Sequence, residues 1–172
     1  MRSAKPYTNA TFTHRVDHEA GRHRPARAPA EPRVCGTCGA VYRGRRWTRA
    51  VPGPVPVSSS GAAAEVTTCP GCRNVTEHAA RGFLYLSGTF VDAHRDEVER
   101  LVKAEARRTL DDNPTARIIA WEAVPAGPLV VTTTTEHLAQ RLGHALEKAY
   151  DGEVRFDFSH ENKLARVYWH RD

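Results

Sequence analysis

The chain has 172 residues, which is enough for one ordinary domain or two small ones. Hydrophobic residues make up 40% and charged residues 26%, so part of the chain can bury a core. No run of about 18 apolar residues occurs, and the polar N-terminal segment lacks the apolar stretch of a secretory signal. We therefore expect a cytoplasmic protein with no membrane partner.

Positive charge is concentrated toward the N-terminus. Residues 1–50 contain 11 Lys and Arg against 3 Asp and Glu, whereas residues 83–172 contain 12 against 15. Residues 1–33 are rich in Pro, Ala and Arg and lack apolar periodicity, so we predict a basic, flexible tail there. The arginines of this tail are predicted to bind RNA phosphates without sequence preference. The candidate residues are Arg22, Arg24, Arg27 and Arg33.

Four cysteines stand in two close pairs, Cys35-Gly-Thr-Cys38-Gly39 and Cys69-Pro-Gly-Cys72. Each C-x-x-C pair lets a tight turn aim two thiolates at one ion, and two pairs supply a closed tetrahedral shell. Gly39 suits a turn position that needs a positive φ. We therefore predict a zinc ribbon over residues 34–80, holding one structural Zn²⁺ between two metal knuckles. A redox dithiol and an iron–sulfur cluster are the alternatives.

A short basic segment lies between the two cysteine pairs. Residues 40–51 are predicted to form one strand, 51–64 a flexible loop, and 65–68 a second strand. The first strand is predicted to grip RNA phosphates and stack on exposed bases. Its candidate contact residues are Arg43, Arg45, Arg46, Trp47 and Arg49. In the alternative interpretation, Tyr42 and Trp47 pack under the metal site while the arginines are simply solvated; alternate residues of a strand allow both.

Residues 81–172 are predicted to form a compact α+β domain. Strands are expected at 82–91, 116–124, 128–135, 153–159 and 163–171. One helix of about 17 residues is expected after an N-cap at Asp92, and another from Glu136, which has capping-box spacing with Thr133. The order is strand, helix, strand, strand, helix, strand and one extra strand. It predicts a ferredoxin-like βαββαβ(β) domain.

One face of this predicted sheet is a second candidate surface. Arg155 and Asp157 are expected to point away from the helices, and Arg166, Tyr168 and His170 share one side of the last strand. The domain is net acidic and lacks the strand pattern of an RNA-recognition motif, so we expect a scaffold or protein-contact role. The sequence contains no nucleophile elbow, phosphate loop or deaminase motif. We therefore expect no enzymatic activity and no small-molecule substrate.

The cysteine pairs and the strand that follows them resemble a known family. The shared pattern is C-x-x-C-G-x-x-Tyr-x-x-x-x-Trp, then C-x-x-C, then G-F-L-Y-L-S-G. The pattern extends over about 60 residues. Its matching positions are Cys35, Cys38, Gly39, Tyr42, Trp47, Cys69, Cys72 and 82–88. It is similar to the N-terminal region of the archaeal and eukaryotic adaptor proteins that bind the large ribosomal subunit and, in eukaryotes, escort its nuclear export.

This resemblance implies zinc binding and attachment to large-subunit RNA without catalysis. Together with the basic segment, it leads us to expect a non-enzymatic, ribosome-associated protein acting in subunit assembly or in stress and hibernation. The competing hypothesis is a zinc-ribbon adaptor for protein partners, such as a transcription regulator, that does not bind RNA.

Overall fold

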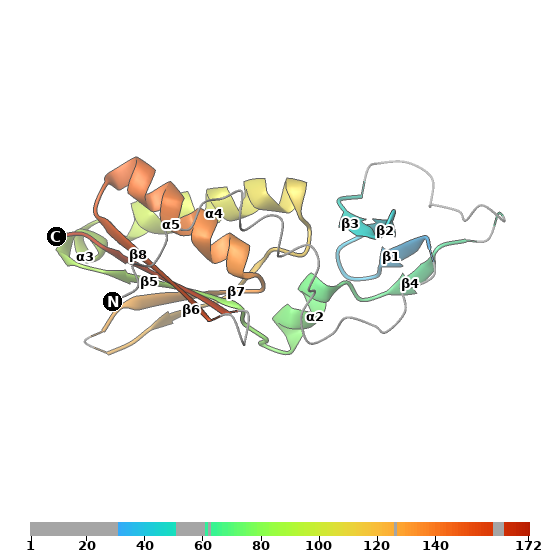
Figure 1. The fold of residues 1–172 in the computed structure, drawn as a ribbon, viewed down its shortest axis with the longest axis horizontal. Coiled ribbons are helices and arrows are strands. Elements are labelled where there is room, and N and C mark those ends of the chain that lie inside the picture. The colour runs from blue at the N-terminus through green and yellow to red at the C-terminus, as the bar shows by residue number, and fades with distance from the viewer. Residues whose placement is uncertain (1–30, 51–60, 62, 126, 160–163) are drawn as a thin grey trace, which may run out of the picture.

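The computed structural model describes residues 31–50, 61, 63–125, 127–159 and 164–172. Within these residues the chain is a mixed α and β structure with two sheets and four helices (Figure 1). Most of the predicted tail lies outside them, together with its Arg22, Arg24 and Arg27, and so does most of the predicted loop at 51–64. No helix among the described residues is both long and apolar enough to cross a membrane.

The first sheet surrounds the cysteines and has the strand order β3-β2-β1-β4. Its strands are β1 (Arg33–Cys35), β2 (Val41–Arg43), β3 (Arg46–Thr48) and β4 (Glu65–Thr67). Arg33 therefore belongs to the sheet rather than to the tail, and the carboxylate of Glu65 pairs with its guanidinium at 2.7 Å. Because β1 and β4 run parallel with Cys35 opposite Thr67, the sheet brings the second cysteine pair beside the first.

The segment predicted as one strand over 40–51 is a hairpin instead. β2 and β3 pair antiparallel around a two-residue turn, Gly44–Arg45, whose φ angles are 60° and 61°. Two consecutive positive φ values give the turn type whose twist matches that of paired strands. The carboxylate of Glu31 accepts hydrogen bonds from the backbone N–H of Gly44 (2.9 Å) and of Arg45 (2.8 Å), which fixes the turn.

The second sheet follows the short helix α2 (Pro70–Thr76) and has the order β6-β7-β5-β9-β8. In chain order its elements are β5 (Gly82–Ser87), α3 (Thr89–Ala93), α4 (Arg95–Asp112), β6 (Ile118–Ala123), β7 (Leu129–Thr133), α5 (Glu136–Tyr150), β8 (Glu153–Ser159) and β9 (Leu164–His170). The predicted succession of strands and main helices is confirmed, and α3 is an addition. The last two strands pair antiparallel.

The ferredoxin-like strand order is not confirmed. The strand after the second helix, β8, lies at the edge, and β9 lies between β8 and β5. β9 runs parallel to β5, which makes the sheet mixed. Burial gives the physical reason: Ala165, Val167 and Trp169 of β9 are fully buried, whereas alternate residues of β8 are charged and exposed, as suits an edge strand.

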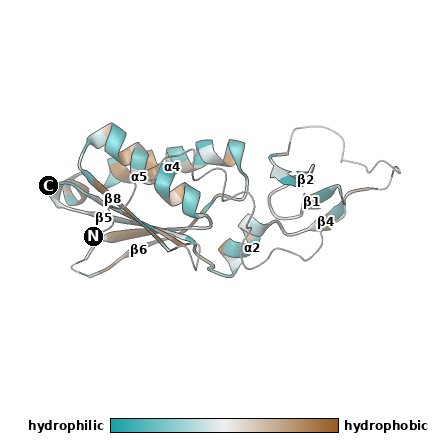
Figure 2. Ribbon diagram, viewed as in Figure 1, coloured by the Kyte–Doolittle hydropathy of each residue, from teal (hydrophilic) through white to brown (hydrophobic). Residues whose placement is uncertain are grey.

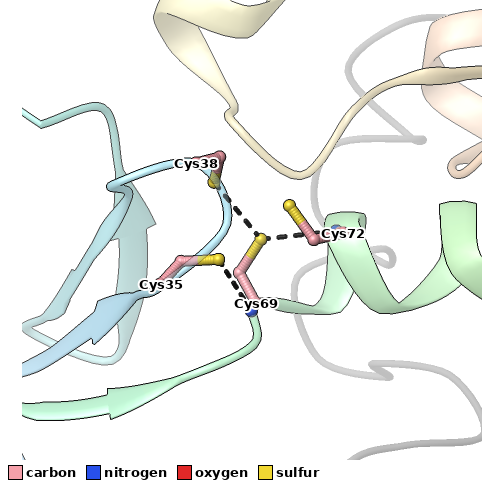
Figure 3. Close-up of side chains that lie close together, drawn as sticks. All are labelled: Cys35, Cys38, Cys69 and Cys72. Atoms are coloured by element: carbon pink, nitrogen blue, oxygen red, sulfur yellow. Dashed lines mark hydrogen bonds between the residues drawn. The ribbon is translucent and has the colours of Figure 1, made fainter.

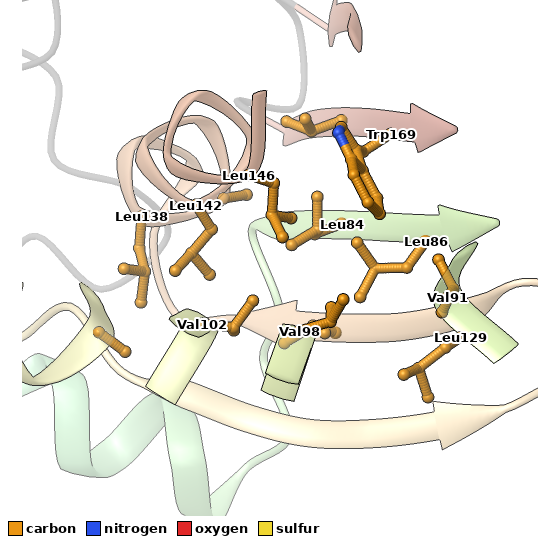
Figure 4. Close-up of a cluster of buried hydrophobic side chains, with 14 of the residues drawn as sticks. Leu84, Leu86, Val91, Val98, Val102, Leu129, Leu138, Leu142, Leu146 and Trp169 are labelled. Carbon is orange, nitrogen blue, oxygen red and sulfur yellow. The ribbon is translucent and has the colours of Figure 1, made fainter. Parts of the chain in front are cut away.

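Helices α4 and α5 cover one face of the second sheet (Figure 1). Both helices are amphipathic, with hydrophobic and hydrophilic residues on different sides (Figure 2). The buried side includes Val98 and Val102 of α4 and Leu138, Leu142 and Leu146 of α5. These side chains meet Leu84, Leu86 and Trp169 from the sheet (Figure 4). The domain therefore has a continuous apolar core of its own.

Two predicted helix caps are wrong. Asp92 lies inside α3, and the residue that precedes α4 is His94, which makes no side-chain capping bond. The cap of α5 is Thr135, whose hydroxyl oxygen accepts a bond from the N–H of Leu138 at 3.3 Å. Thr133 instead donates its hydroxyl to the carbonyl of Thr135 at 2.9 Å. Several threonines in a row offered more than one capping position, and only the tertiary fold selects among them.

Candidate metal centre and basic hairpin

Cys35, Cys38, Cys69 and Cys72 come together in one cluster (Figure 3). Their sulfur atoms all lie within 4.8 Å of one another, and the sulfurs of Cys38 and Cys69 are 3.7 Å apart. A tetrahedral zinc ion with bonds of about 2.3 Å to sulfur places the sulfurs about 3.8 Å apart. The Cys38–Cys69 pair matches this spacing, and the four sulfurs are close enough together to hold one ion. All four cysteines are free thiols in the structure. The predicted ligand set is thus assembled in one place.

The first cysteine pair lies in a tight turn between β1 and β2. The backbone N–H of Gly39 donates to the carbonyl of Cys35 (2.8 Å), and the N–H of Cys35 donates to the carbonyl of Ala40 (2.8 Å). Gly39 has a φ of 72°, as its place after the pair predicted. These bonds close the turn, so that Cys35 and Cys38 point toward the second pair (Figure 3).

The second cysteine pair forms the first turn of a helix rather than a second knuckle. Cys69 is the N-cap of α2, and its sulfur accepts a hydrogen bond from the N–H of Cys72 at 3.4 Å. Pro70 occupies the first helical position, where its fixed φ is favoured and its missing N–H costs nothing. The Cys-Pro dipeptide was therefore the sequence signal for α2, which our prediction of a zinc ribbon overlooked.

Hydrogen bonds and burial affect the thiols of the cluster differently. Burial opposes ionisation of Cys35, but N–H groups of the backbone that point at its sulfur, led by that of Cys69 at 3.3 Å, lower its pKa to about 6. Burial raises the pKa of Cys72 to about 11 and also raises the pKa of Cys69. A bound divalent cation would replace the protons of these buried thiols and supply the charge that burial otherwise disfavours.

No family model, curated protein or solved structure matches this chain. The resemblance to the ribosomal adaptor family stays a prediction. Four cysteine sulfurs close enough together to hold one ion are typical of zinc or of iron–sulfur centres.

The hairpin that carries the predicted RNA-contact residues packs on this cluster through Trp47, and its Arg49 forms an ion pair with Asp111 of α4. Arg43, Arg45, Arg46 and Arg49 are all exposed. Arg43 and Arg46 are directly opposite each other on β2 and β3, which places two like charges side by side. The backbone N–H groups of Arg45 and Gly44, and then the charges of Arg45 and Arg43, hold the pKa of the Glu31 carboxyl below its usual range, so a carboxylate lies near this pair.

The two aromatic residues of the hairpin lie on its other side. Trp47 is half-buried and packs against the cysteine cluster, and Tyr42 is buried. Their rings are 5.4 Å apart at an angle of 50°. Trp47 therefore packs at the cysteine cluster, as the alternative interpretation expects, and Tyr42 packs on Trp47. The role of Trp47 in base stacking stays a prediction.

The open face of the second sheet carries a stack of side chains across three strands. The ring of Tyr168 on β9 lies 4.8 Å from the ring of Tyr85 on β5, nearly parallel to it. On its other side, the guanidinium of Arg155 on β8 lies 4.3 Å from the centre of the Tyr168 ring. Both faces of Tyr168 are therefore occupied within the protein, which leaves neither free to stack on a nucleic-acid base.

Proposed function

We propose that this chain is a non-enzymatic, metal-stabilised protein that binds the large ribosomal subunit through ribosomal RNA. The observation that carries the proposal is the placement of Arg43, Arg45 and Arg46 on an exposed hairpin whose opposite side packs on the four-cysteine cluster. The metal, which we infer to be one Zn²⁺, holds the hairpin in shape, and the guanidinium groups bind phosphates.

The ligand set favours a structural metal over a catalytic one. All four positions of a tetrahedral ion are filled by cysteine sulfurs, so no position is left for water or substrate. A structural ion of this kind stabilises a small module whose own apolar core is limited. This chain fits that case, since the buried cluster around the metal site consists mainly of the cysteines themselves.

The arginines favour a polyanionic partner. A guanidinium donates two parallel hydrogen bonds to a phosphate, and it keeps its charge at any physiological pH. The exposed Arg43 and Arg46 lie directly opposite each other on β2 and β3, which places two guanidinium groups where one phosphate can accept from both. The resemblance to ribosomal adaptors points to large-subunit RNA as the polyanion, and the role in assembly or in hibernation under stress follows from that resemblance alone.

A double substitution in the hairpin tests the proposal. Arg45→Gly is combined with Arg46→Ala, because Arg45 has a positive φ that glycine adopts without strain. We expect binding to purified large subunits to weaken at least tenfold at near-physiological salt, with the metal content unchanged. The matched control is Arg95→Ala with Arg100→Ala, which removes the same charge from the exposed side of α4. Equal binding by the double variant and the parent would remove the hairpin as the contact surface.

A further inference from the structure

A cleft separates the metal centre from the C-terminal end of α4. Its volume is about 320 Å³, near the lower end of the range for ligand-binding cavities. Arg49, which follows β3, and Cys38 of the cluster line it on one side. Arg107 and Asp111 of α4 and Arg117, which precedes β6, line it on the other.

The side chains around this cleft carry an excess of positive charge. Three guanidinium groups from three separate parts of the chain face one carboxylate, that of Asp111, and Arg49 forms an ion pair with it. Arg107 is exposed and makes no ion pair among the described residues. Two of the three positive charges are therefore not neutralised by a neighbouring carboxylate.

Arg117 is held in position at this cleft by its own backbone and side chain. Its Nε donates to the carbonyl of Pro114 at 3.1 Å, and its backbone N–H donates to the hydroxyl of Thr134 at 2.8 Å. A half-buried guanidinium fixed in this way loses little side-chain entropy when it binds a ligand.

We propose that the cleft binds a phosphate group, with Arg107 and Arg117 as its principal donors. The proposal rests on the proposed RNA binding. It gives the RNA a second contact with the protein, in which a phosphodiester lies between the metal centre and α4. Arg49 links the two contacts, since it lies in the cleft and only one residue beyond the end of β3.

The three arginines have one competing role. Four thiolates around a divalent ion carry a formal charge of −2 for the whole centre. One of the four cysteines, Cys38, lines the cleft. The guanidinium groups would then serve to balance the charge of the loaded metal centre. That role affects metal retention, whereas phosphate binding affects affinity for phosphate-containing ligands, so the two are separable by measurement.

The experiment uses the full metal-loaded chain and two probes, inorganic pyrophosphate and purified large ribosomal subunits. The variants are Arg107→Glu, which changes an exposed side chain, and Arg117→Lys, which keeps the charge but loses the planar fork. Arg100→Glu on the same helix is the control outside the cleft lining. Affinities are measured by calorimetry for pyrophosphate and by sedimentation for the subunits, and metal release to a chelator is followed in parallel.

We expect Arg107→Glu to weaken binding of both probes about tenfold and Arg100→Glu to change it far less. Arg117→Lys should weaken pyrophosphate binding without loss of metal. Unchanged affinities combined with faster metal release would assign the arginines to charge balance and overturn the phosphate site. Failure of the parent to bind pyrophosphate would also overturn it. If the parent binds pyrophosphate through Arg107 but ignores ribosomal subunits, the site stands as one for a small phosphate compound, and the proposed RNA function fails.

Discussion

At the scale of single residues, the four cysteines determine how binding of a metal ion would depend on pH. Burial raises the pKa values of Cys69 and Cys72, so both thiols hold their protons at neutral pH until a cation displaces them. We therefore predict that the apparent zinc affinity rises steeply with pH between 6 and 8, by at least about 100-fold per pH unit, because each of these two thiols releases a proton when the ion binds. Competition with a chromophoric chelator at several pH values measures it. A flat profile would mean that the cluster is already ionised without metal.

Gly71 determines how closely α2 approaches the rest of the protein. A Cβ atom at this position would lie 2.6 Å from both the Cα and the carbonyl oxygen of Thr115, in the segment before β6. Neither backbone atom can move aside cheaply, so we predict that Gly71→Ala destabilises the protein by about 1–3 kcal/mol. Urea unfolding measures the change.

The matched control is Gly36→Ala, in the turn that carries the first cysteine pair. There the nearest atom is the terminal methyl of Val66, at 3.1 Å, and Val66 is 72% exposed and has room to shift. We expect a much smaller effect than at Gly71. Equal losses at the two positions would argue that the close approach of α2 to Thr115 contributes nothing of its own.

At the scale of elements, an ion-pair network joins α4 to α5. Glu105 of α4 is buried, and its carboxylate accepts bonds from Arg141 Nε of α5 (2.5 Å) and from Arg108 Nη1 (3.1 Å). Burial opposes ionisation of Glu105, but Arg141 and Arg108 together outweigh it, and the pKa of this carboxyl is lowered. The network thus stabilises the folded state above the ordinary pKa of a glutamate and loses this contribution as the pH falls through the lowered value.

Replacing Glu105 tests this network. Glu105→Ala leaves Arg141 half-buried with Asp112 as its remaining partner, at 3.3 Å, so we predict a loss of about 3 kcal/mol at pH 7. The loss should shrink below pH 4. Glu97→Ala, on the exposed part of the same helix, is the control and should cost less than about 0.5 kcal/mol. Thermal unfolding of both variants at pH 7 and pH 3.5 measures these losses of stability. A loss for Glu105→Ala that does not change with pH would mean that Glu105 stabilises the fold by packing rather than by its charge.

Elements that are determined by a pattern of residues close together in the chain were predictable from the sequence. Strands β5 to β9 and helices α4 and α5 follow from apolar periodicity, and the metal ligands follow from the C-x-x-C spacing. The β2–β3 hairpin was missed because its turn, Gly44–Arg45, lacks the Asn-Gly or Asp-Gly signature. It depends instead on the carboxylate of Glu31, 13 residues earlier in the chain.

Features that depend on distant residues were not predictable. The insertion of β9 beside β5 follows from the burial of Trp169, whose Nε1 donates to the carbonyl of Asp151 at 2.8 Å. The parallel pairing of β1 with β4 joins segments about 30 residues apart. Local patterns contain no information about which of several strands will become neighbours. The cleft beside Arg117 is likewise formed by three segments that no spacing connects.

At the scale of the whole molecule, the metal module (residues 34–73) and the α/β domain (residues 83–172) differ in the interactions that stabilise them. The module has only a small cluster built around the cysteines, whereas the domain has the large core of Figure 4. We therefore predict that chelation of the metal unfolds residues 34–73 and largely spares residues 83–172. Amide spectra of the isotope-labelled chain, recorded before and after chelation, report on both parts. Joint loss of both sets of signals would show that the contact of Gly71 with Thr115 makes them one cooperative unit.

We propose that the basic hairpin, held in shape by a metal ion at the four cysteines, attaches this protein to ribosomal RNA. The most direct test is co-sedimentation of the metal-loaded chain with ribosomes and separated subunits on a density gradient, at low and high salt. We predict migration with the large subunit at low salt and its loss at high salt, because bound arginines release counterions from the phosphates. A protein that stays at the top of the gradient at every salt concentration would contradict RNA binding and favour a zinc-dependent adaptor for protein partners.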